Sequence, residues 1–77
     1  MSSIVPIVEN DRLRGVGQRL RDLRLAAGET QTQTANSLGL SRQYVSAAEL
    51  GANITLDIVY RFADHFKVPA SSLLDSK

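Results

Sequence analysis

The stretch from Thr30 to Gly51 limits the possible folds of this chain more than any other part of the sequence. It opens with a threonine followed three residues later by a glutamine, the pattern of a helix-capping box, and a serine at position 41 marks a second helix start. Gly39 stands between them, where a helix C-terminus favours a residue with positive φ. We therefore predict a helix over residues 31–38, a glycine turn, and a second helix from residue 42 to about residue 50.

Two short helices joined by a glycine turn form a helix-turn-helix motif, whose second helix can enter a DNA major groove. The second helix has an apolar side, with Val45 and Ala48, that can face a core. Arg42 and Gln43 at its start suit base edges, because arginine pairs bidentately with guanine and glutamine with adenine. Both residue types are also common on solvated surfaces, so a helical bundle that binds no DNA is an equal alternative on composition alone.

The positive charge of the chain is concentrated in one region. The net charge is only +1, but residues 12–48 contain six arginines and two acids. Residues 49–77 contain four acids and three basic residues, and residues 1–11 contain two acids. A basic region that coincides with the first three helices is a mild indication of a DNA-facing surface.

Length and composition exclude several classes of protein. A chain of 77 residues is sized for one small domain, and without cysteine and with a single histidine it offers neither a disulfide nor a zinc site. We therefore expect no metal and no cofactor. No apolar run approaches the ~18 residues of a membrane span and no signal peptide is visible, so we expect a cytoplasmic protein without a membrane partner. No catalytic constellation is visible either, so we expect no catalytic residues and no enzyme.

The first nine residues are predicted to be a tail, and residues 10–77 to be the domain. Ile4, Val5, Ile7 and Val8 favour β-structure, but Pro6 among them allows only an edge strand or an extended segment. Two interpretations stay open: a frayed terminus, or an arm that pairs with a partner chain.

Three further helices are predicted around the central motif. The first begins near Asn10 or Asp11 and runs to about Ala27, with Gly17 placed to allow a close helix contact. Thr55 caps a fourth helix that Lys67 ends, and a short fifth helix follows. Apolar residues at spacings of three and four predict the buried stripes of the first and fourth helices: Leu13, Val16, Leu20, Leu23 and Ala27, and Leu56, Val59, Phe62, Ala63 and Phe66.

These features together resemble the lambda-repressor-like, or Cro/C1-type (XRE), helix-turn-helix domain. The resemblance covers about residues 16–74 and rests on LRDLRLAAG, on Gln31 with Ala35, on LGLSRQYVSAAELG and on LDIVYRFADHFKV. It implies an all-α, five-helix fold, a homodimer, and regulation of transcription at palindromic operators in double-stranded DNA. A chain this short is similar to phage-type repressors and to the controller proteins of restriction-modification systems.

The resemblance also implies roles for single residues. The base-contacting positions of the family fall on Arg42, Gln43, Ser46 and Ala47. Its DNA-backbone positions fall on Gln31, Ser41, Tyr44 and Asn53. Arg24 and Glu49 match an ion pair that ties the first helix to the recognition helix.

At two positions the chain departs from the family pattern, and each departure predicts a structural difference. Thr34 stands where the family usually has leucine, and its hydroxyl can bond back to the Thr30 carbonyl, so we expect looser packing of the second helix. Leu50 stands where a basic or polar residue is frequent, so one phosphate contact is expected to be missing.

Partners other than DNA are suggested by apolar residues outside the core stripes. Ile58, Tyr60 and Leu74 are predicted to form a homodimer patch near the last two helices. The alternative function is that of an antitoxin that binds a toxin and autoregulates its operon, which the apolar tail from Ile4 to Val8 would serve. RNA polymerase is a further candidate partner, because controller proteins can activate as well as repress.

Overall fold

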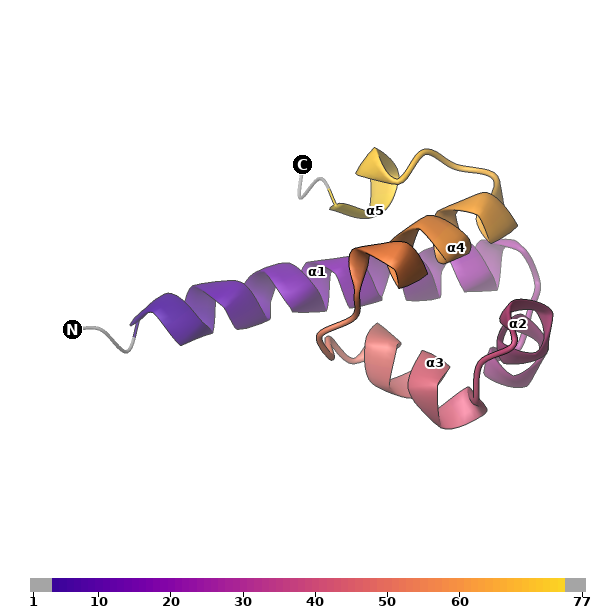
Figure 1. Ribbon diagram of the computed structural model, residues 1–77, viewed down its shortest axis with the longest axis horizontal. Coiled ribbons are helices and arrows are strands. Elements are labelled where there is room, and N and C mark those ends of the chain that lie inside the picture. The colour runs from indigo at the N-terminus through magenta and orange to yellow at the C-terminus, as the bar shows by residue number, and fades with distance from the viewer. Residues whose placement is uncertain (1–3, 75–77) are drawn as a thin grey trace.

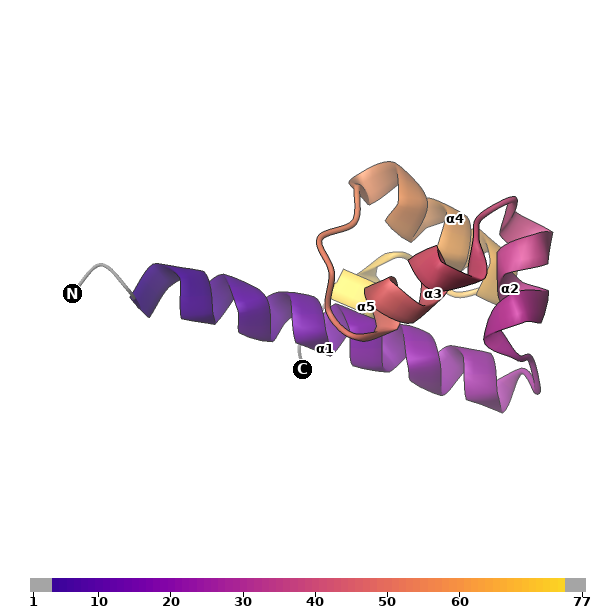
Figure 2. The same ribbon diagram turned by 90° about the horizontal axis from the view of Figure 1, so that it is seen from below.

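The computed structural model describes residues 4–74, and their side chains from Asp11 onward. These residues form five helices and no strand, which confirms the predicted all-α, five-helix class. The helices are α1 (Ile4–Ala26), α2 (Gln31–Leu38), α3 (Arg42–Glu49), α4 (Leu56–Phe66) and α5 (Ser71–Leu74). The other helices gather around the C-terminal part of α1, and its N-terminal part projects from the domain in both views (Figure 1, Figure 2). Within residues 4–74, no helix combines the length and apolar character that a membrane span requires.

The predicted start of α1 near Asn10 or Asp11 is wrong, because the helix begins at Ile4. Pro6 suggested an extended segment, but it is the third residue of the helix. The first four N–H groups of a helix have no intrahelical partner, so a proline there removes no hydrogen bond. Residues 4–9 are therefore helical rather than extended, residues 1–3 lie outside the described residues, and the division at residue 10 stays a prediction.

The caps predicted for α2 and α3 are present. Thr30 Oγ1 accepts a hydrogen bond from the Gln33 amide at 3.0 Å, and Gln33 Oε1 accepts one from the Thr30 amide at 2.8 Å. Ser41 Oγ accepts a hydrogen bond from the Tyr44 amide at 3.0 Å. Gly39 has a φ of 69°, a left-handed conformation that ends α2 and that glycine adopts without steric cost. The caps set where the two helices of the motif begin and end.

The core lies where the five helices meet, and its largest fully buried side chain is Phe62. Three residues predicted for the buried stripes lie outside it. Leu13 is only partly buried and is not among the side chains packed against the core. Leu56 is 54% exposed, because it opens α4 at the edge of the domain. Ala27 is exposed because α1 ends one residue before it. The remaining buried apolar residues are Val16, Leu20, Ala35, Leu38, Val45, Ala48, Val59, Ala63 and Leu73.

Thr34 does not loosen α2 as the sequence suggested. It is fully buried, and its hydroxyl donates to Glu29 Oε1 at 2.6 Å. The same carboxylate meets His65 Nε2 of α4 at 2.9 Å. The hydrogen bond from Thr34 and then the contact with His65 hold the pKa of Glu29 below its usual value. A polar cluster therefore ties the α1–α2 loop to α2 and α4 in place of the apolar contact that a leucine would make.

Candidate nucleic-acid interface

The four predicted base-contacting residues lie on the outer side of α3. Val45 and Ala48 are buried against the core at 0% and 2% exposure. The intervening side is open: Arg42, Gln43 and Ala47 are exposed, and Ser46 is partly exposed. Because Ser41 caps the helix, the side chains of its first turn stand at a free helix N-terminus, where backbone N–H groups and the helix dipole favour an anion.

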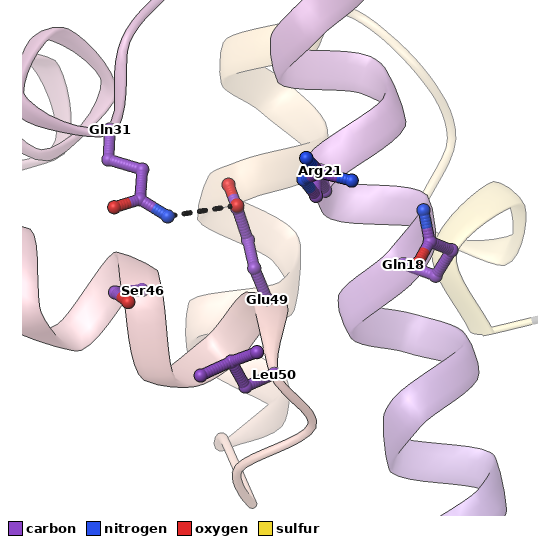
Figure 3. A pocket seen from close by; sticks show the side chains of 6 residues that line it. All are labelled: Gln18, Arg21, Gln31, Ser46, Glu49 and Leu50. Carbon is purple, nitrogen blue, oxygen red and sulfur yellow. Dashed lines mark hydrogen bonds between the residues drawn. The ribbon is translucent and has the colours of Figure 1, made fainter.

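Gln31 links the start of α2 to both ends of α3. Its Nε2 donates to Glu49 Oε1 at 3.1 Å, and its Oε1 accepts from Arg42 Nη1 at 3.5 Å, the outer limit for a hydrogen bond. The first of these bonds is drawn in Figure 3. The structure therefore brings together a predicted backbone-contacting residue and a predicted base-contacting residue.

Arg24 and Glu49 form a buried, bidentate ion pair between α1 and α3. Arg24 Nε donates to Glu49 Oε2 at 2.6 Å and Nη2 donates to Oε1 at 3.0 Å, while Nη1 donates to the Glu29 carbonyl at 2.8 Å. The hydrogen bonds that Arg24 donates to the Glu49 carboxylate raise the pKa of the guanidinium, so the group stays charged. The pair fixes the C-terminal end of α3 against α1.

A pocket of about 300 Å³ opens beside this network (Figure 3). Ser46, Glu49 and Leu50 of the α3 segment form one side, and Gln31 contributes from α2. Gln18 and Arg21 of α1 complete the lining, and neither is among the interface residues predicted from the sequence. A signal for Arg21 exists in its spacing: it precedes Arg24 by three residues, so the two share a side of α1.

The remaining predicted residues differ in exposure. Tyr44 is partly buried in α3, and Asn53 is exposed in the loop between α3 and α4. Of the predicted dimer residues, Tyr60 is 53% and Leu74 48% exposed, whereas Ile58 packs against the core. Within the described residues, no group of three or more histidine or acidic side chains is placed to hold a metal ion.

The chain is similar to a family model and to solved structures of regulatory proteins. A family model described as helix-turn-helix matches residues 20–73. The restriction-modification controller protein C.AhdI from Aeromonas hydrophila is 36% identical, with a TM-score of 0.74 over 82% of this chain and 96% of that one. A hypothetical transcription factor, NHTF from Neisseria, is also 36% identical, with a TM-score of 0.75 over 84% of this chain and 77% of that one. No curated protein matches the chain significantly.

Proposed function

The chain belongs to the lambda-repressor-like (XRE-type) helix-turn-helix family, and on this premise we propose that it regulates transcription as a homodimer bound to palindromic operators. The observation that carries the proposal is the open, polar side of α3 beside the N-terminus of α2, with Gln31 in contact with Arg42. In this arrangement α3 enters the major groove and its first turn faces the base edges.

Sequence discrimination is assigned to the outer side of α3. Arg42 stands in its first turn and can donate to two acceptors on one guanine, and Gln43 can pair with adenine. Ser46 lies one turn further along, and Ala47 can offer a methyl contact to thymine. Affinity is assigned mainly to phosphate contacts, which position the protein without discriminating between sequences. The proposed phosphate contacts are Gln31, Ser41, Tyr44 and Asn53.

The two-fold axis is assigned to the side formed by α4 and α5. Tyr60 and Leu74 are exposed apolar residues there, and Leu56 at the start of α4 adds a third. Exposed apolar residues grouped in this way favour an interface, and a two-fold dimer is the commonest arrangement. A dimer of this kind would place its two recognition helices on half-sites about 34 Å apart, one turn of DNA.

Arg42→Ala is expected to weaken operator binding and to relax base preference at one base pair in each half-site, by about 1–3 kcal/mol of discrimination. The operator is first obtained by selection on random DNA. Competition binding at one fixed salt concentration is then measured on operators altered one base pair at a time. Gln31→Ala is the matched control, because loss of a phosphate contact weakens all sequences by similar factors.

Two outcomes would count against these assignments. An Arg42→Ala variant that keeps the wild-type preference at every base pair would make Arg42 a backbone contact. A selection on random DNA that enriches no sequence would contradict the proposal that the protein is a sequence-specific regulator.

Tyr60→Glu is expected to shift the protein from dimer to monomer at micromolar concentration, because it places a charge in an apolar interface. Leu25→Glu is a close control: Leu25 lies on α1 and is 53% exposed, the same fraction as Tyr60. Sedimentation velocity of the wild type and both variants measures the change. A wild type that is monomeric both free and on DNA would contradict the proposed dimer. Equal dissociation of both variants would contradict the placement of the dimer interface on α4 and α5.

The similarity to a restriction-modification controller favours that role over the antitoxin alternative. We propose that the chain controls genes beside its own, by blocking RNA polymerase or by recruiting it. The identity of the neighbouring gene distinguishes the two: a restriction endonuclease supports a controller, and a toxin supports an antitoxin.

A further inference from the structure

The pocket between α1 and α3 has an asymmetric lining. Its α3 side carries Leu50, which is 79% exposed, and its α1 side carries Arg21, which is also exposed. Arg21 forms no hydrogen bond or ion pair with any other described residue, whereas the neighbouring Gln18 donates to Asp22 at 3.0 Å. The guanidinium of Arg21 is therefore a lining cation without a hydrogen-bond or ion-pair partner among the described residues.

The charge balance of this pocket favours an anion. Glu49 lies at its floor, but both carboxylate oxygens accept hydrogen bonds from Arg24, so the buried pair is neutral as a unit. Gln31 Nε2 donates a further hydrogen bond to Oε1 of the same carboxylate. The positive charge of Arg21 is then uncompensated among the lining groups, and an oxyanion can accept two parallel hydrogen bonds from its guanidinium.

The position of the pocket identifies the anion. Gln31 and Ser46 line it and belong to the proposed DNA-facing side, so the strand that borders α3 in the major groove would pass over it. We propose that this pocket receives a phosphate of the DNA backbone and that Arg21 is the residue that binds it. The inference rests on the proposed function. A phosphate contact from Arg21 would replace the one expected to be missing at Leu50, because the positive charge is supplied from α1 instead of from the end of α3.

The test compares Arg21→Gln with Arg12→Gln. Arg12 is also exposed and lies nine residues earlier, which is half a turn around α1 and about 13 Å along it. Both variants lose one positive charge, but only Arg21 lines the pocket. Binding to the selected operator and to an unrelated duplex is measured by fluorescence anisotropy at several salt concentrations. Circular dichroism verifies that both variants fold.

Arg21→Gln is expected to weaken binding to both duplexes by a similar factor, about tenfold, without changing base preference. The slope of log K against log salt should fall by about 0.9, the amount for one phosphate, while Arg12→Gln keeps the wild-type slope. A scan of neutral methylphosphonate substitutions should find one position per half-site that weakens the wild type but has no further effect on Arg21→Gln.

The possible outcomes separate this inference from the function on which it rests. If wild type binds its operator and the two variants have equal slopes, Arg21 is a solvated arginine and the pocket assignment is wrong. If Arg21→Gln changes preference at one base pair, Arg21 contacts a base, and the assignment is again overturned. If wild type binds no duplex, the proposed function fails and this inference fails with it.

Discussion

Gly17→Ala is expected to lower the free energy of unfolding by roughly 3 kcal/mol, the upper part of the usual range for overpacking. A Cβ at this position would lie 2.5 Å from the carbonyl oxygen of Ala48 and 2.6 Å from that of Glu49. Both obstacles are backbone atoms of α3, so no side chain can rotate away. The melting temperature should fall by about 12–24 °C, measured by circular dichroism.

Gly15→Ala provides the control two residues away in the same helix. Its Cβ would meet only the end of the flexible Arg19 side chain, at 3.4 Å. Alanine is the better helix former by about 1 kcal/mol, so this variant should melt at or above the wild-type temperature. Equal effects of the two substitutions would mean that helix propensity, rather than the contact between α1 and α3, determines the outcome.

The caps of α2 and α3 could be predicted from sequence because capping is local. Thr30 and Gln33 are three residues apart, and the hydrogen bonds that define the box join no other part of the chain. The glycine at the end of α2 is a signal of the same kind. The position of the central motif followed from such signals, whereas the resemblance to the family rested on longer stretches before, within and after it.

The errors arose where tertiary contacts or helix position override a local signal. Pro6 indicates a break, but it is harmless in the first turn of α1, and only the position of the helix start could reveal this. Thr34 is more polar than the leucine usual in the family, but its hydroxyl donates to Glu29, whose carboxylate also meets His65 of α4. The spacing of Arg21 from Arg24 places both on one side of α1, but the sequence does not show that this side borders a pocket against α3.

Glu49→Ala is expected to lower the free energy of unfolding by about 3–4 kcal/mol, because it strands the buried charge of Arg24. Arg24 is 8% exposed and would keep one partner, the Glu29 carbonyl. The expected fall in melting temperature is roughly 12–32 °C. Asp64→Ala is the control: it removes an exposed acid from α4, and its effect should stay within about 0.5 kcal/mol. Equal, small losses in both variants would contradict the role of the pair in stability.

The pair can be separated from simple packing by a double-mutant cycle. Arg24→Met and Glu49→Leu each leave one buried ion uncompensated, whereas the double variant replaces both ions by apolar groups. The double variant should therefore be less destabilised than the sum of the single variants, by about 2 kcal/mol or more in urea unfolding. Its operator affinity should not recover, because Gln31 would still lack the carboxylate that holds its amide beside Arg42. Additive losses would mean that the two side chains act independently, and restored affinity would mean that Glu49 does not position Gln31.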